Sequence, residues 1–66
     1  MSNSIIKSIS REVVHAFMRG EWSCRVFGKL LDIEHVNGAE YRVTLSDQDI
    51  GLRFMAEHGK LRFFLA

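Results

Sequence analysis

The hydrophobic and polar positions of the last fifteen residues, 52–66, alternate in a way that predicts a β-hairpin and its register. A two-residue turn at His58 and Gly59 pairs Glu57 with Lys60, so that opposite charges face each other beside the turn. One face of the hairpin is then entirely apolar and carries Leu52, Phe54, Ala56, Leu61, Phe63 and Leu65. A shift of one residue would mix both kinds of side chain on both faces, so the pattern selects this pairing.

Apolar residues near the N-terminus recur at helical spacing over about residues 5–19, and Gly20 is expected to end that helix. Val14 and Met18 lie outside the main apolar stripe. Two interpretations remain open for them. Either the helix sits deep in a concave sheet that buries both side chains, or Val14, Met18 and Trp22 form a second apolar edge that meets a partner or a second copy of the chain.

Two further strands are predicted between the helix and the hairpin, at about 22–35 and 39–45. Within the first of them the apolar residues change parity at Gly28, which we interpret as a β-bulge in one long strand. A three-residue loop, 36–38, then joins the two strands and keeps polar residues opposite polar residues. The expected pairs are Leu31 with Val43, Asp32 with Arg42 and Ile33 with Tyr41.

The chain is therefore expected to form a single domain, 1–66, of the α+β class, in which the N-terminal amphipathic helix packs on a four-stranded antiparallel β-meander. The strands are expected at about 22–35, 39–45, 51–57 and 60–65, with a turn at 46–49. The alternative fold is a small SH3-like or Sm-like barrel, closed by a strongly bent first strand. An N-terminal helix before short, turn-linked strands is a feature shared with Sm-like proteins.

A chain of 66 residues is close to the lower limit for a stable single core, so self-association or a partner is expected. Its 47% hydrophobic and 26% charged residues are typical of a folded globular protein. We expect a cytoplasmic protein without membrane contact, because no apolar run reaches the roughly 20 residues of a membrane span and the start lacks a signal-peptide pattern. The single cysteine, Cys24, agrees with a reducing compartment.

Residue types that carry catalysis or bind metals are few and scattered, namely His15, Cys24, His35 and His58. They match no zinc-ligand spacing, and the glycines form no phosphate-binding loop. Cys24 has the parity of the apolar face and is expected in the core. Asp47 and Asp49 are expected to bond to their own backbone in a turn, because a calcium loop would need more oxygen ligands at regular spacing. No catalytic site, metal site or cofactor is expected.

The polar face of the expected sheet is the candidate binding surface. It is predicted to carry Arg42, Thr44, Arg53, Met55, Arg62 and Phe64. Arginine beside aromatic and methionine side chains is typical of protein interfaces, and exposed sheet faces of this kind also bind single-stranded nucleic acid. Three carboxylates at one side of the same face, Asp32, Glu34 and Glu40, together with a net charge of only +1, favour a protein partner over a nucleic-acid backbone.

Three short runs, 41–43, 52–54 and 59–61, read Tyr-Arg-Val, Leu-Arg-Phe and Gly-Lys-Leu, and together they look like the meander of RelE/ParE-type toxins. The resemblance covers only about a third of the chain. The helical pair and the C-terminal catalytic segment of that family have no counterpart in this sequence, so no site residue is carried over. What the resemblance implies is an RNase-like toxin remnant, which is the least favoured of three hypotheses.

The favoured hypothesis is a small non-enzymatic binding protein that occupies a surface of a larger host protein or complex, as small phage or mobile-element inhibitors and regulators do. The alternative is a nucleic-acid-binding module that uses the outer sheet face. A homodimer through Val14, Met18 and Trp22 is a separate hypothesis.

Overall fold

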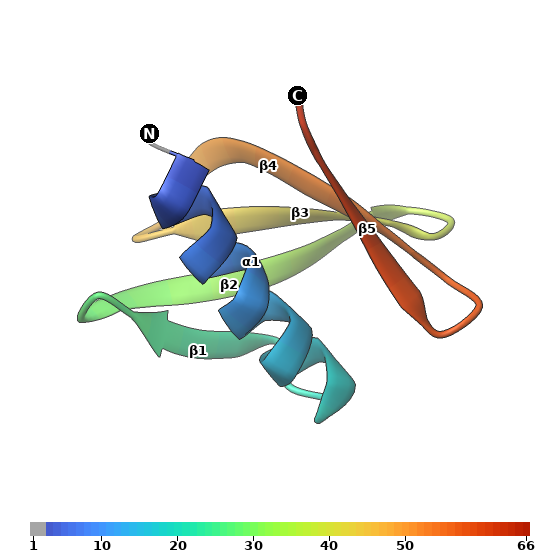
Figure 1. Ribbon diagram of the computed structural model, residues 1–66, viewed down its shortest axis with the longest axis horizontal. Coiled ribbons are helices and arrows are strands. Elements are labelled where there is room, and N and C mark those ends of the chain that lie inside the picture. The colour runs from blue at the N-terminus through green and yellow to red at the C-terminus, as the bar shows by residue number, and fades with distance from the viewer. Residues whose placement is uncertain (1–2) are drawn as a thin grey trace.

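The computed structural model describes residues 3–66 and consists of one helix and one five-stranded antiparallel sheet (Figure 1). Residues 1 and 2 of the expected domain lie outside this range. The elements are α1 (Asn3–Met18), β1 (Ser23–Val26), β2 (Lys29–Asn37), β3 (Glu40–Leu45), β4 (Gln48–Glu57) and β5 (Lys60–Leu65). The strands neighbour one another in chain order. The predicted α+β class with an N-terminal helix and a meander is confirmed, whereas the predicted number of four strands is wrong.

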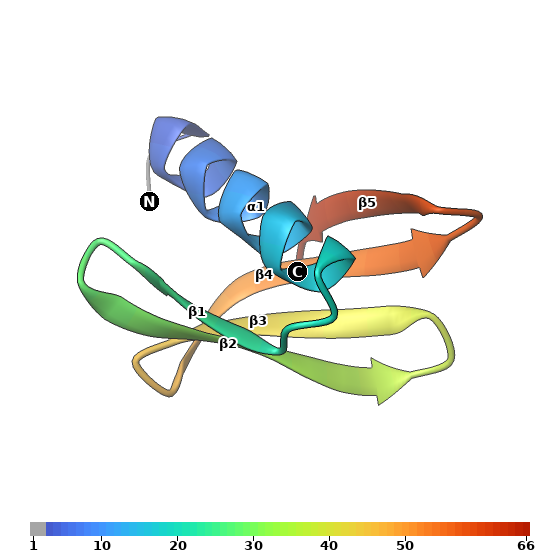
Figure 2. The same cartoon turned by 90° about the horizontal axis from the view of Figure 1, so that it is seen from below.

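The helix lies in the hollow of a curled sheet, which forms a half-barrel with β1 and β5 as its two edges (Figure 2). The sheet is therefore curled like part of a barrel, but in the described residues β1 and β5 do not pair to close it, as the alternative fold would require. The core between the helix and the sheet consists of Ile9, Val13 and Ala16 from α1 and of Val26, Leu31, Ile33, Val43, Leu52 and Phe54 from the strands. Each of these side chains is buried, and burial of one Val, Leu, Ile or Phe side chain contributes about 1.5 to 3 kcal/mol.

Gly20 ends the helix, as predicted. It has a φ of +75°, and its N–H donates to the carbonyl of Phe17 at 3.0 Å. The N–H of Glu21 donates to the carbonyl of Ala16 at 2.9 Å. These two bonds form the Schellman motif, which requires a left-handed residue that glycine adopts without strain.

The predicted bulge at Gly28 is wrong, because this residue lies in a turn. Phe27 and Gly28, with φ of 55° and 73°, form a two-residue turn that joins two separate strands, β1 and β2. Such a turn pairs Cys24 with Leu31, residues of opposite parity, on the same face of the sheet. The change of parity along the chain was therefore the sign of a hairpin. The sequence does not signal this turn, because its first residue is phenylalanine instead of Asn, Asp or Gly.

The pairing of β2 with β3 differs from the predicted one by two residues. Ile33 lies opposite Val43, and a bulge between His35 and Asn37 precedes the turn. A shift of two residues leaves every side chain on its predicted face, because the side-chain period of a strand is two.

The strand β4 begins three residues before the predicted position and is strongly bent (Figure 1). Thr44 pairs with Asp49, but the preceding residue Val43 pairs with Leu52. Ile50 and Gly51 are therefore extra residues on β4, and Gly51 has a φ of +75°. Irregularities of this kind bend a strand and increase its twist, which accounts for the curl of the sheet.

The final hairpin has the register that the sequence predicts. Glu57 lies opposite Lys60 and Phe54 opposite Phe63, and the pairs extend to Leu52 and Leu65. His58 and Gly59 form the turn, with φ of 53° and 76°. No helix within residues 3–66 is both long and apolar enough to cross a lipid bilayer.

Candidate protein-binding surface

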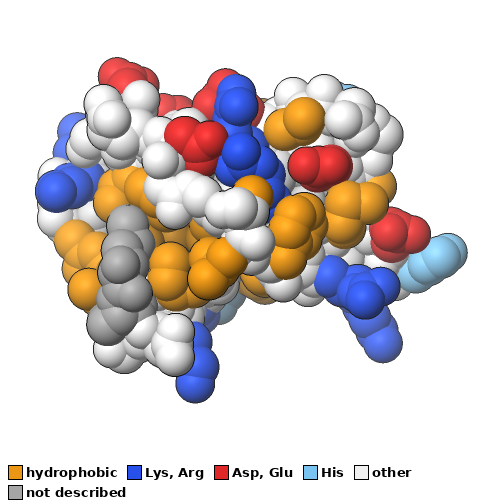
Figure 3. All heavy atoms as spheres, turned by 90° about the horizontal axis from the view of Figure 1, so that it is seen from above, with side chains coloured by type: hydrophobic (Ala, Val, Ile, Leu, Met, Phe, Trp, Pro, Cys, Tyr) orange, Lys and Arg blue, Asp and Glu red, His pale blue; other side chains and the backbone are white. Residues whose placement is uncertain are grey.

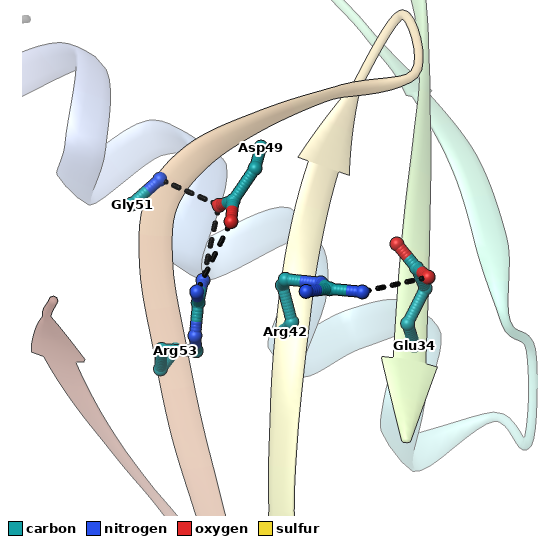
Figure 4. Close-up of polar contacts among 5 residues, drawn as sticks. All are labelled: Glu34, Arg42, Asp49, Gly51 and Arg53. Carbon is teal, nitrogen blue, oxygen red and sulfur yellow. Dashed lines mark hydrogen bonds and ion pairs between the residues drawn. The ribbon is translucent and has the colours of Figure 1, made fainter. Parts of the chain in front are cut away.

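The six residues of the predicted binding surface all lie on the sheet face opposite α1, which we call the outer face. Each has the opposite parity to the core residue beside it, such as Val43 or Phe54. Figure 4 shows the side chains of Arg42 and Arg53 on the near side of the sheet, with the helix behind it. Adjacent strands bring neighbours together, with Arg42 opposite Arg53, Arg53 opposite Phe64 and Met55 opposite Arg62. Thr44 pairs with Asp49 and is only 8% exposed.

Arg53 is held by a forked ion pair within its own strand. Its Nη1 donates to Asp49 Oδ1 and its Nη2 to Asp49 Oδ2, both at 3.0 Å (Figure 4). Asp49 Oδ1 also accepts a hydrogen bond from the backbone N–H of Gly51 at 2.9 Å. The Arg53 side chain is only 17% exposed. A planar guanidinium that is already engaged on both arms offers no fork to a partner.

Arg42 is likewise paired, since its Nη2 donates to Glu34 Oε2 at 3.2 Å across β2 and β3. The two ion pairs together carry no net charge. Asp32 and Glu40 also lie on the outer face, opposite Thr44 and Met55, and add further negative charge. A phosphate backbone would have to displace Asp49 and Glu34 and approach these carboxylates, which is unfavourable. The centre of the outer face therefore lacks the positive field that nucleic-acid binding requires.

The Asp49 contact predicts a specific pH dependence. The hydrogen bonds from Arg53, and then that from Gly51, lower the pKa of Asp49 from 3.8 to about 2. A pKa that is lower in the folded state stabilises the fold above pH 3.8 and stops doing so as the pH falls to about 2. The difference in thermal midpoint between the native chain and Asp49→Asn is therefore expected to be largest at neutral pH and to shrink over that interval, as followed by circular dichroism at low salt.

Asp47→Asn is the matched control for this experiment. It removes the same charge two residues away but leaves the forked pair intact. A midpoint difference for Asp49→Asn that stays constant from neutral pH down to about pH 2 would show that Arg53 does not hold the charged carboxylate in solution.

The remaining part of the outer face, Met55, Arg62 and Phe64, is open, and we call these three residues the contact patch. Phe64 is 41% exposed, although it is a large aromatic side chain. Arg62 is exposed. The ion pairs found among the described residues join Arg19 to Glu21, Arg42 to Glu34 and Arg53 to Asp49. None of them involves Arg62. Met55 lies directly opposite Arg62 and is half-buried. The contact patch thus joins an unpaired guanidinium to two apolar side chains at the edge of the sheet.

Hydrophobic side chains are also exposed at one end of the molecule (Figure 3). Figure 3 shows them as a band across the end where both chain termini lie, with charged side chains on either side. Leu65, at the end of β5, is 64% exposed, and Ile5, near the start of α1, is also exposed. On the inner side of β5, Phe17, Met18, Ala56 and Leu61 line a shallow hollow. The sequence predicts this apolar face of the last hairpin but places it in the core, whereas the structure leaves Leu65 exposed on it.

The three residues of the predicted self-association edge are only partly grouped. Trp22 and Met18 are both exposed, and Val14 is half-buried. The Trp22 ring lies 5.9 Å from that of Phe17 and 5.8 Å from that of Tyr41, whereas Met18 lines the hollow beside β5. A dimer through these residues stays a prediction.

The residues with catalytic or metal-binding side chains are dispersed. Burial and the nearby Glu12 raise the pKa of the Cys24 thiol, which is the opposite of what a reactive thiolate needs. His35 Nε2 lies 2.7 Å from the carbonyl oxygen of Gly38, and His58 lies in its turn. Asp49 bonds to its own backbone, as expected. No three metal-ligating side chains gather anywhere within residues 3–66.

Comparisons with protein-family models, with curated proteins and with solved structures found no match for this chain.

Proposed function

We propose that this chain is a non-enzymatic binding protein that docks on the surface of a larger protein through the contact patch of Met55, Arg62 and Phe64. The observation that carries the proposal is the exposed Phe64 on the outer face, on the same strand as Arg62, which takes part in none of the ion pairs found among residues 3–66. Arginine and aromatic side chains are the residue types that contribute most to protein interfaces. The proposed surface contains three of the six residues that the sequence suggests. Arg42 and Arg53 are left out because they are engaged in ion pairs, and Thr44 because it is buried.

The charge on the outer face supports a protein partner. Asp49 and Glu34 neutralise the two central arginines, so Arg62 in the contact patch is the outer-face arginine outside the ion pairs found in the described part of the chain. A single fork of this kind fits one carboxylate or one backbone carbonyl group on a protein, whereas a nucleic-acid strand needs several phosphate contacts for useful affinity. We further propose that the chain is an inhibitor or regulator that acts by occupying a surface of its partner, as small proteins of phages and mobile elements do.

The test is a comparison of variants in partner capture, followed by titration of the purified partner. Phe64→Ala and Arg62→Ala are each expected to weaken binding at least tenfold, which corresponds to about 1.4 kcal/mol. The matched control is Phe27→Ala, because Phe27 is a phenylalanine with 61% exposure in a different hairpin. This control is expected to bind like the native chain.

Two results would contradict the proposal. One is a partner that binds the native chain and both contact-patch variants equally well. The other is binding of single-stranded or duplex oligonucleotides that falls steeply with added salt and is lost in Phe64→Ala, because this would assign the contact patch to nucleic acid.

A further inference from the structure

The outer edge of β5 is an unpaired strand edge whose exposed backbone groups can be identified. A two-residue turn makes the flanking residues Glu57 and Lys60 a hydrogen-bonded pair. Pairs of this kind alternate along the strand, and the bond from Ala66 N–H to the Gly51 carbonyl at 2.8 Å follows the same alternation. The N–H and C=O groups of Leu61, Phe63 and Leu65 therefore point away from β4, toward the open edge.

The two edges of the sheet differ in how well they are protected. The other edge strand, β1, has only four residues, and three of its side chains are Ser23, Cys24 and Arg25. In contrast, β5 has six residues, contains neither proline nor a bulge, and pairs with β4 without interruption. Short strands, proline, bulges and charged side chains are the usual features that prevent a further strand from adding to an edge. The β5 edge lacks the first three, and its charged residues are Lys60 and Arg62.

We propose that two copies of this chain pair through their β5 strands, antiparallel about a two-fold axis at Phe63. Phe63 then lies opposite Phe63 of the second copy, and Leu61 opposite Leu65 of the second copy. The residues whose backbone groups point outward become the hydrogen-bonded pairs of the new ladder. Two five-stranded sheets join into one sheet of ten strands.

Charge selects this register among those that the edge allows. With the axis at Phe63, Arg62 faces Phe64 of the second copy, an arrangement that favours stacking of a guanidinium on an aromatic ring. With the axis moved to Leu61, Lys60 would face Arg62 of the second copy, and like charges directly opposite each other are destabilising. With the axis moved to Leu65, most of the edge would stay unpaired. An axis at Arg62 would place Arg62 opposite Arg62 of the second copy, and an axis at Phe64 would leave Leu61 unpaired. The register with its axis at Phe63 is thus the one that pairs all three outward-facing residues without like charges opposite each other.

A row of rings on the inner face supports the same axis. His35, Tyr41, Phe54 and Phe63 occupy paired positions on β2, β3, β4 and β5. Their successive ring centroids are 5.0, 5.1 and 5.2 Å apart, within the range of favourable aromatic contacts. The row stops at the sheet edge with Phe63, which is half-buried. A second Phe63 across the axis continues the row and covers this last ring.

The same pairing also explains the exposure of Leu65 at the end of β5. Leu65 of one copy would lie beside Leu61 of the other, next to the hollow that Met18 lines. The inference does not depend on the proposed function. It adds that the Arg62 and Phe64 side chains of both copies form one continuous two-fold surface on the outer face.

Sedimentation of the purified protein over a range of concentrations tests the dimer. The native chain is expected to approach twice 7.6 kDa, and Leu65→Lys is expected to stay at 7.6 kDa at the same concentrations. Leu30→Lys is the matched control, because Leu30 is also an exposed leucine, and it should behave like the native chain. Monomeric native protein at every concentration would overturn the inference. So would a dimer that Met18→Glu dissociates and Leu65→Lys does not, since this would place the interface at Val14, Met18 and Trp22.

A cysteine experiment tests the register even if Leu65→Lys does not fold. In a chain with Cys24→Ser, Arg62→Cys and Phe64→Cys are made separately, and both positions lie on the surface. Directly opposed residues have Cα atoms within the roughly 4.4 to 6.8 Å that a disulfide spans. Oxidation is expected to cross-link a mixture of the two variants faster than either variant alone. Equal cross-linking of all three samples would overturn the register. Both experiments use the purified chain, so their failure is separable from a failure of partner capture.

Discussion

Replacement of Phe54 by alanine is expected to lower the free energy of unfolding by about 3 to 5 kcal/mol. Phe54 is fully buried, and its ring lies 5.3 Å from that of Phe17, 5.1 Å from that of Tyr41 and 5.2 Å from that of Phe63. The substitution removes the ring that links the helix to the last three strands. Because a domain of this size rarely has more than about 3 to 5 kcal/mol of stability, the variant is expected to be largely unfolded at 25 °C.

Urea unfolding measures this effect, followed by the fluorescence of the single tryptophan, Trp22, and by far-ultraviolet circular dichroism. Phe64→Ala is the matched control, because Phe64 has the same side chain in the same hairpin but lies on the outer face. It should change the free energy of unfolding by less than about 1 kcal/mol. Similar losses for both variants would contradict the assignment of the two faces.

Leu31→Ala is expected to lower the free energy of unfolding by about 2 to 5 kcal/mol. Leu31 is fully buried on β2, between Cys24 of β1 and Leu45 of β3. Its removal leaves a cavity where three strands meet the helix, and backbone hydrogen bonds limit how far the sheet can collapse around it. The same urea titration measures the loss.

The neighbouring residue Leu30 provides the control for this prediction. It lies next to Leu31 on β2, but its side chain is 44% exposed. Leu30→Ala is expected to change the free energy of unfolding by less than about 1 kcal/mol. If Leu30→Ala cost as much as Leu31→Ala, the β1–β2 hairpin would have a different register from the one in the structure.

The parts of the fold that could be predicted from the sequence are those where side-chain alternation and turn chemistry agree. In the last hairpin, a His-Gly turn and an uninterrupted alternation select the same register, and the structure has that register. The outer face was also assigned correctly, because the error in the β2–β3 pairing was two residues and left each side chain on its face. Face assignment therefore tolerates an error that exact pairing does not.

The parts that could not be predicted depend on backbone conformations that the residue types do not indicate. Phe27, Ser46 and Asp47 all adopt positive φ in turns, and phenylalanine is an uncommon residue there. The two extra residues of β4, Ile50 and Gly51, interrupt an otherwise regular alternation. They also place Asp49 where it reaches Arg53. The loss of Arg53 from the candidate site thus follows from a bend that strand periodicity cannot reveal, whereas Arg42 is engaged by its cross-strand neighbour Glu34.

The order of the strands has a consequence for how the chain reaches this fold. Every strand pairs with the one that precedes or follows it in sequence, and the connecting turns are short. Each pairing therefore closes a small loop, and the entropy lost at each closure is low. Topologies with such local pairing reach the native state without a slow search for distant segments, which shortens the time during which an incomplete sheet is exposed to aggregation.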